Sequence, residues 1–208
     1  VIEAGFAAAS PGDFESLKTI ASEIDGATIC SLARCNPQDI EAAAQAIDAN
    51  PNKRIHVFVA TSDIHLEHKL DMTQDAVVKA AFAGVKLAKT FCDNVEFSPE
   101  DASRTDRNFL VEIVNATIAA GATTINIPDT VGYSIPFEYG NLFKYLIENC
   151  EGSENVIFSA HCHDDLGLSV ANSLAALESG ARQVECTING IGERAGNTSL
   201  EEICMAIK

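Results

Sequence analysis

Short apolar runs recur along the chain and alternate with longer segments of helical periodicity. Seven strand-like runs, rich in β-branched residues, cover residues 1–6, 27–32, 54–60, 95–97, 123–127, 156–160 and 183–188. Between them lie predicted helices at 13–24, 36–49, 73–88, 107–119, 137–149 and 168–179. This order, with no apolar–polar alternation read inside the strands, is typical of a parallel sheet covered by helices. It leaves two α/β architectures, a doubly wound open sheet and an eight-stranded barrel.

The polar residues that follow the strands favour the barrel. Clusters of polar side chains come directly after at least five of the runs, as at residues 61–63, 98–101 and 161–164. The carboxyl ends of all strands meet at one mouth in a barrel, whereas an open sheet brings together only the one or two beside its switch point. We therefore predict a (β/α)8 TIM barrel.

The number of strands predicts that this barrel is incomplete. The chain has 208 residues and seven strand-like runs, whereas the complete fold has eight strands and about 250 residues. We expect the first βα unit to be absent, so that residues 1–208 form a partial TIM-barrel catalytic domain with strands 2 to 8 and no second domain. The absence of a starting methionine also suggests a fragment.

Charge and cysteine usage narrow the class of protein. Fourteen Lys and Arg against thirty Asp and Glu give a net charge of −16, which argues against partners such as nucleic acid or an anionic membrane surface. No apolar stretch approaches the roughly 18 residues that a membrane-spanning helix needs. The seven cysteines show no CxxC spacing, so we interpret them as free thiols of a cytoplasmic protein.

The pair His161 and His163 is the first candidate metal site. It follows the run 156–160, and if the chain is still extended there, the side-chain period of two places both imidazoles on one face. Neutral imidazoles at a barrel mouth bind divalent metals. Asp164 and Asp165 follow directly and would serve as further ligands or as acceptors that fix the ring tautomers. The alternative is one core histidine and one surface histidine.

A glycine-rich segment, residues 189–197, follows the last strand-like run. Its three glycines allow the backbone to approach a ligand closely. Its polar side chains, Glu193, Arg194 and Asn197, could contact that ligand. The alternative is a plain turn in which Asn197 or Thr198 caps the final helix. A turn alone rarely needs an adjacent Glu-Arg pair, which favours a functional loop.

Earlier strands add single candidates. Glu100 is a candidate base, and His56 lies among apolar neighbours, where a core histidine is the simpler interpretation. Asn126 lies inside a predicted strand, and no turn signal explains an asparagine at that position. His65 and His68 have the spacing of one helix face, and we expect them mainly on the surface.

Three segments resemble one enzyme family. They are residues 2–6 with 10–15, residues 161–167 with 171–173, and residues 183–197, which include the run Gly-Glu-Arg-Ala-Gly-Asn. Together they closely resemble the isopropylmalate synthase and homocitrate synthase family of metal-dependent acyltransferase barrels. The resemblance covers essentially the whole chain, and the last motif is its most specific part.

The resemblance implies a Claisen-type condensation. The family member of closest resemblance joins acetyl-CoA to 3-methyl-2-oxobutanoate and hydrolyses the thioester, the first committed step of leucine biosynthesis. By resemblance, the metal ligands are His161, His163 and Asn197, and the metal is Mn²⁺ or Mg²⁺, with Zn²⁺ as an alternative. It likewise implies catalytic roles for Glu100 and His56 and a homodimer in the full-length enzyme. The residues that match the oxo-acid pocket are Leu32, Ser98, Asn126, Pro128 and Thr130.

Several alternatives stay open within and beyond the family. Residues 164–166 and 185–187 favour an isopropylmalate synthase over a citramalate, homocitrate or methylthioalkylmalate synthase. A retro-aldol lyase on the same barrel and a non-catalytic metal-binding module are the others. The family takes a fourth metal ligand, an Asp, and a catalytic Arg from its first strand, and neither is in this sequence. We therefore expect these residues to be part of a longer enzyme and to be inactive alone.

Overall fold

The computed structural model describes residues 1–208, and its centre is one parallel sheet of seven strands. The strands are β1 Ile2–Phe6, β2 Ile29–Arg34, β3 Lys53–Ala60, β4 Val95–Glu100, β5 Thr124–Asp129, β6 Ile157–Cys162 and β7 Gln183–Glu185. Each strand pairs in parallel with the next one in the sequence, from β1 to β7. A doubly wound sheet would reverse its strand order at a switch point. The uninterrupted order therefore confirms the barrel, and because β1 and β7 do not pair with each other, the barrel is incomplete.

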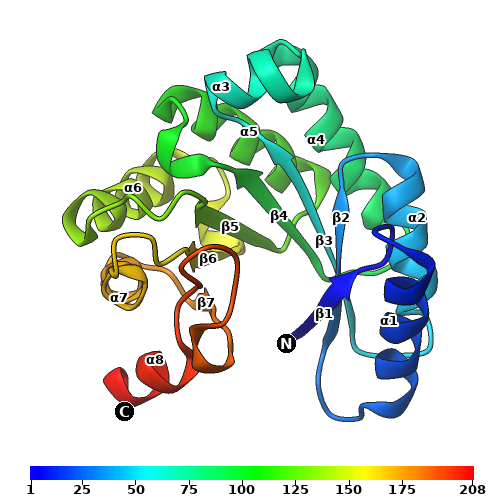
Figure 1. The fold of residues 1–208 in the computed structure, drawn as a ribbon. Coiled ribbons are helices and arrows are strands. Elements are labelled where there is room, and N and C mark those ends of the chain that lie inside the picture. Colours follow the sequence, from blue (N-terminus) through cyan, green and yellow to red (C-terminus); the bar gives the residue numbers. More distant parts are fainter.

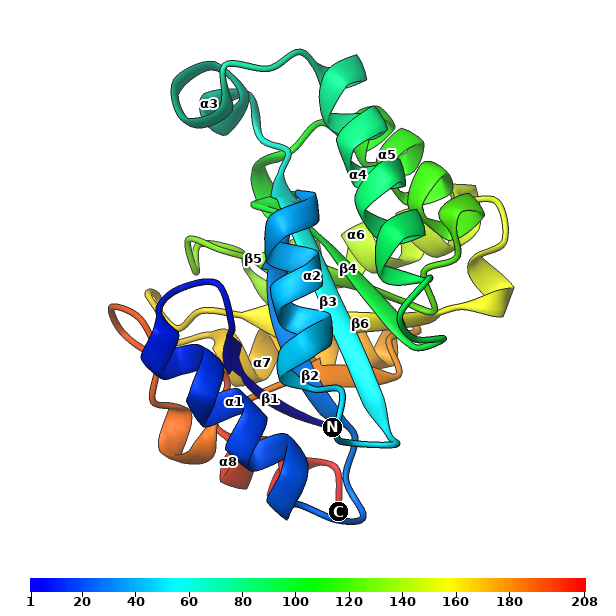
Figure 2. The same ribbon diagram turned by 90° about the vertical axis from the view of Figure 1, so that its right-hand side faces the viewer.

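The helices cover the convex side of this curled sheet (Figures 1 and 2). They are α1 Pro11–Glu23, α2 Pro37–Ala46, α4 Gln74–Ala88, α5 Arg107–Ala120, α6 Pro136–Asn149, α7 Ser169–Glu178 and α8 Leu200–Ala206. A short turn, α3 Asp63–His65, continues into the π-helical turn Leu66–Leu70. The side chains of Ser10, Asn36 and Thr73 cap α1, α2 and α4 by accepting a hydrogen bond from a backbone N–H of the first turn. None of the helices is both long and apolar enough to cross a membrane.

The apolar core lies between the outer face of the sheet and the helices. Alternate strand residues such as Ile55, Val57, Phe97, Ile125 and Ile127 are fully buried in it. The residues between them are polar and point into the concave side: Arg54, His56, Glu96, Ser98, Thr124, Asn126, Ser159, His161, Gln183 and Glu185. The expectation of no alternation inside the strands is therefore wrong. The strands alternate because their outer residues pack against the helices, whereas their inner residues line the polar interior that contains the candidate site.

Arg54 connects strands that are not neighbours in the sheet. Its guanidinium donates to Glu96 of β4 at 2.7 Å, to Gln183 of β7 at 2.8 Å and to Asn94 at 2.8 Å. Gln183 in turn donates to Glu96 at 2.8 Å. A hydrogen bond from β3 to β7 spans three intervening strands, so this buried network stabilises the curl of the sheet.

Candidate metal centre and polar interior

His161 and His163 lie at the end of β6, with their rings inclined by 66° and their Nε2 atoms pointing toward each other. Their Nε2 atoms are 3.1 Å apart, as the side-chain period of two predicts. The Nδ1 atom of His161 is 2.7 Å from the Glu185 carboxylate. Such a contact fixes the tautomer and directs the other ring nitrogen. The acceptor is therefore Glu185, whereas Asp164 and Asp165 were expected to serve as further ligands or as such acceptors.

The two aspartates have other partners. Asp164 accepts hydrogen bonds from the backbone N–H and the hydroxyl of Ser169 at the start of α7, at 3.0 and 2.6 Å. Asp165 forms a two-pronged ion pair with Arg194, at 2.8 Å for each prong. Both carboxylates therefore stabilise the loops around the histidines and neither contacts an imidazole.

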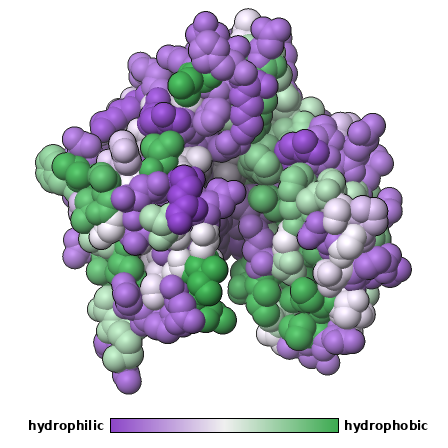
Figure 3. All heavy atoms as spheres, in the orientation of Figure 1, coloured by the Kyte–Doolittle hydropathy of each residue, from purple (hydrophilic) through white to green (hydrophobic).

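Asn197 comes to the same place from the glycine-rich loop. Its backbone forms an antiparallel bridge with His163, and its Oδ1 atom is buried without a hydrogen-bond partner. Asn197, His161 and Glu185 line one cavity of about 640 Å³ between β1 and β7, where Figure 3 shows the molecular surface hollowed. The structure thus brings the three predicted metal ligands together, and Asn197 does not cap the final helix, since Ser199 does.

The donor set fits a divalent cation. Two adjacent ligands at about 2.1 Å in octahedral geometry are about 3.0 Å apart, which is close to the 3.1 Å between the two Nε2 atoms. Burial and the neighbouring His161 lower the pKa of His163, which favours the neutral ring that ligation needs. Burial also lowers the pKa of His161, but the hydrogen bond and charge of Glu185 outweigh it and raise this pKa, so a cation bound there would displace a proton from His161. The buried oxygen of the Asn197 carboxamide, which has no hydrogen-bond partner, is the third candidate donor. Unpaired buried acceptors are rare unless something absent from the chain completes them.

His56 is the hub of a second polar group on the inner face. Its Nδ1 is 2.6 Å from the Glu3 carboxylate and its Nε2 is 2.6 Å from the Ser98 hydroxyl. Asn126 donates to the same hydroxyl at 2.9 Å, and its Oδ1 is buried without a partner. The predicted residues His56, Ser98 and Asn126 are therefore in one hydrogen-bonded chain that crosses from β1 to β5.

The charge on His56 is set by three carboxylates. Burial lowers its pKa, but the negative charges of Glu3, Glu96 and Glu185 outweigh burial and raise the pKa to about 10. His56 is therefore an imidazolium at neutral pH. With both ring nitrogens protonated, it acts as a hydrogen-bond donor and not as a base.

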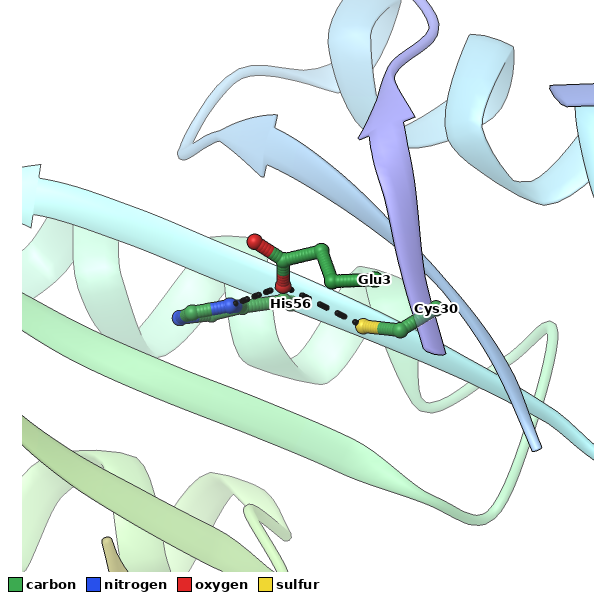
Figure 4. A group of neighbouring side chains, drawn as sticks. All are labelled: Glu3, Cys30 and His56. Atoms are coloured by element: carbon green, nitrogen blue, oxygen red, sulfur yellow. Dashed lines mark hydrogen bonds and ion pairs between the residues drawn. The ribbon is translucent and has the colours of Figure 1, made fainter. Parts of the chain in front are cut away.

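Glu3, Cys30 and His56 form a group whose residue types and spacing could hold a metal ion. Figure 4 shows the Glu3 carboxylate between the His56 ring and the Cys30 sulfur. Cys30 donates to Glu3 at 3.5 Å, and burial together with the Glu3 charge raises the pKa of the thiol. Metal ligation needs a thiolate and a neutral imidazole. The Cys30 thiol and the His56 ring both keep their protons, which favours the hydrogen bonds to Glu3 over a bound metal.

The remaining predicted residues lie around these two groups. Glu100, at the end of β4, holds the Lys69 ammonium with both oxygens, at 2.6 and 2.9 Å. Leu32 is in register with His56 across β2 and β3, and Pro128 is in register with His161 across β5 and β6. Thr130 accepts a hydrogen bond from the Asp101 backbone N–H at 2.9 Å. No hydrogen bond joins Glu100 to either histidine group.

The second histidine pair is divided between two environments. His65 is 3.2 Å from the fully buried carboxylate of Asp101 and 3.0 Å from the Ser62 hydroxyl. The side chain of His68 is 67% exposed. The two histidines do not converge on one site. The expectation that both lie mainly on the surface is confirmed for His68 and wrong for His65, whose side chain is 23% exposed because it packs on Asp101.

Sequence reasoning missed the charged residues of the inner face. Glu3, Arg54, Glu96 and Glu185 all lie on the concave side with His56, and none was singled out in these roles. The signal that would have found them is the period of two within strands. Residues 54 and 56 of β3, and residues 96, 98 and 100 of β4, are polar at alternate positions.

The raised pKa of His56 predicts a loss of stability at alkaline pH. The folded protein keeps its proton up to about pH 10, whereas an exposed histidine loses it near 6.5. The stabilising contribution is therefore complete below pH 6.5 and disappears as the pH rises through 10. We expect the free energy of unfolding to fall by up to about 1.4 kcal/mol per pH unit in this window. Urea titrations at pH 6, 8 and 10 test this, and a His56→Gln variant with the same pH slope would contradict it.

Fold and site together define a class of protein: an incomplete parallel (β/α) barrel with a polar, histidine-containing centre at the carboxyl ends of its strands. The HMGL-like family matches residues 1–208, and the chain belongs to this family.

Curated relatives of high sequence identity share one name. The chain is 60% identical over 208 residues to the 2-isopropylmalate synthase of Rhodopirellula baltica and 61% identical over 208 residues to that of Thiobacillus denitrificans. These matches cover the whole chain but 40% and 41% of the relatives, so the chain spans less than half of their length. A hydroxymethylglutaryl-CoA lyase from Pseudomonas aeruginosa has the same fold, with a TM-score of 0.80 at 18% identity over 98% of this chain and 70% of the lyase.

Proposed function

We propose that this chain is the larger part of the catalytic barrel of a 2-isopropylmalate synthase. The reaction is the condensation of acetyl-CoA with 3-methyl-2-oxobutanoate followed by thioester hydrolysis, a step of leucine biosynthesis. The observation that carries the proposal is the pair of facing imidazole nitrogens of His161 and His163, beside the unpartnered oxygen of Asn197. Relatives of 60% identity with this name support the choice of reaction. The activity is proposed for the full-length protein.

His161, His163 and Asn197 would hold the metal ion. A divalent cation bound there supplies Lewis-acid polarisation of the ketone of a 2-oxo acid. Two nitrogen donors and one oxygen donor suit Mn²⁺ or Mg²⁺ when carboxylate and water complete the set, and the two imidazoles also suit Zn²⁺. Glu185 holds the His161 ring so that its Nε2 faces the cavity.

His56 and its neighbours would bind the oxo acid. The His56 imidazolium has both N–H groups in hydrogen bonds, to Glu3 and to Ser98, so it would act on the oxo acid through Ser98. Because His56 and Asn126 both donate to the Ser98 oxygen, the Ser98 O–H is left to donate to an oxygen of the substrate. Leu32, Pro128 and Thr130 would line the same pocket.

Glu100 would act as the proton acceptor. Its carboxylate lies at the mouth and is one-fifth exposed, and Lys69 holds both of its oxygens. A carboxylate in this position accepts a proton from the methyl group of the acetyl thioester if the substrate reaches it. We further propose a cytoplasmic homodimer, and the seven free cysteines support the reducing compartment.

The test of function compares three oxo acids in the full-length protein. Thiol release from acetyl-CoA is measured with 3-methyl-2-oxobutanoate, pyruvate and 2-oxoglutarate. We expect kcat/KM to be at least about tenfold higher for 3-methyl-2-oxobutanoate, since each missing methylene group weakens binding in an apolar pocket by about that factor. A preference for pyruvate or 2-oxoglutarate would assign citramalate or homocitrate synthase instead. Pyruvate formation without CoA would show a lyase, and metal binding without any turnover would show a binding module.

A further inference from the structure

Arg194 joins three successive loops at the mouth of the barrel. Its guanidinium donates to both carboxylate oxygens of Asp165, in the loop after β6, at 2.8 Å each. It also donates to the backbone carbonyl of Thr130, in the loop after β5, at 2.8 Å. Arg194 itself belongs to the glycine-rich loop after β7. One side chain therefore fixes the relative positions of the loops that follow β5, β6 and β7.

The neighbouring backbone is shaped for this contact. At Gly132, which has a φ of 64°, an added Cβ would overlap the Asp165 carboxylate, so only glycine allows this approach. Arg194 has a φ of 56°, in the left-handed region that non-glycine residues rarely adopt. Such a conformation is strained and persists where the surrounding contacts hold it. The three hydrogen bonds of the guanidinium are contacts of that kind.

The same loop carries Asn197 to the histidine pair. Gly196 and Asn197 are held by backbone hydrogen bonds to Glu193 and Gly190, at 2.9 and 3.0 Å. The Asp164 N–H donates to the Gly196 carbonyl at 2.9 Å, next to His163 in the sequence. These bonds and the antiparallel bridge hold the Asn197 backbone against His163, and Asn197 and His161 line the same cavity. Arg194 lies in the same loop and fixes it to the loops after β5 and β6.

We propose that Arg194 is a positioning residue for the metal site, which holds the loop 190–197 so that Asn197 stays within ligand distance of a cation on His161 and His163. The inference rests on the proposed function, because it needs that metal site. Arg194 does not touch the metal position itself and acts through Asp165 and the Thr130 carbonyl. A surface ion pair of the ordinary kind would contribute almost nothing.

Metal affinity distinguishes a positioning role of Arg194 from an ordinary surface ion pair. Mn²⁺ binding to the full-length protein is measured by titration calorimetry, without substrate, for Arg194→Gln, Asp165→Asn and Arg194→Lys. We expect Arg194→Gln and Asp165→Asn to weaken Mn²⁺ binding about tenfold, in the lower part of the range found when groups that orient metal ligands are removed. Arg194→Lys should recover part of the loss. The matched control is Arg34→Gln, because Arg34 makes a two-pronged ion pair with Asp39, at 2.5 and 3.2 Å, and it should leave Mn²⁺ binding unchanged.

A double-variant cycle with Asn197→Ala separates positioning from general loop stability. If Arg194 acts through Asn197, adding Arg194→Gln to Asn197→Ala should weaken Mn²⁺ binding by less than twofold further. Full additivity of the two changes, or an unchanged affinity in Arg194→Gln, overturns the proposal. If Asn197→Ala alone leaves Mn²⁺ affinity unchanged, the metal-site assignment itself fails, which is a different result. Should Arg194→Gln unfold the protein, Asp165→Asn tests the same pair.

Discussion

Replacing His163 with alanine in the full-length protein is expected to abolish tight divalent-metal binding and to lower kcat/KM by at least about a thousandfold. The change removes one of two nitrogens that face each other at 3.1 Å. A bound cation contributes several kcal/mol of charge stabilisation to such reactions, and each 1.36 kcal/mol corresponds to a factor of ten. His161→Ala should have the same effect. Elemental analysis of the purified variants gives the metal content, and thiol release gives the activity.

The matched control is His68→Ala, because this histidine is largely exposed and lies outside both polar groups. It should keep full metal content and full turnover. An unchanged metal content in both His161→Ala and His163→Ala would show that the cation is held elsewhere. The Glu3, Cys30 and His56 group would then be the next candidate.

Replacing Arg54 with methionine is expected to destabilise the barrel by about 3–5 kcal/mol, the range found when one partner of a buried ion pair is removed. Arg54 and Glu96 are both almost fully buried, and the change leaves Glu96 with a hydrogen bond from Gln183 and the charge of His56. Burial raises the pKa of Glu96 to about 7. The carboxylate therefore takes up a proton at low pH, and the loss should be smaller at pH 5 than at pH 8. Urea unfolding followed by far-ultraviolet circular dichroism at both pH values measures it.

Two further variants show whether the uncompensated charge is the cause. Arg54→Met combined with Glu96→Gln removes the charge and should recover most of the lost stability. Lys53→Met, at the adjacent position, breaks an ion pair with the exposed Asp48 and should change stability by less than about 1 kcal/mol. A double variant as unstable as Arg54→Met alone would show that packing, and not charge, accounts for the effect.

The sequence predicted the strands closely because each is a compact β-branched run. The run 54–60 became β3 Lys53–Ala60, and 123–127 became β5 Thr124–Asp129. The exception is the last strand, predicted to reach residue 188. It ends at Glu185, and a turn with Asn189 in the left-handed region follows. Ile188 looks like a strand residue by composition, yet it is exposed.

The candidate site was predictable only in part. The two histidines were found because their spacing is local, and Asn197 because its motif is specific. The partners of Arg54 and His161 were not found. Arg54 and Gln183 are 129 positions apart, and His161 and Glu185 are 24 apart, so these contacts exist only once the sheet has curled. Asp165 was expected at the histidines because it is close in sequence, but Arg194 binds it instead.

The separation of the sheet into an apolar outer face and a polar inner face has a consequence for how such a barrel changes over time. Residues that pack against the helices and residues that line the polar interior occupy alternate positions of the same strands. An inner residue that takes no part in the buried Arg54–Glu96 pair can therefore be exchanged without disturbing the packing of the helices. Changes of this kind alter the interior by small steps, each of which leaves a folded protein.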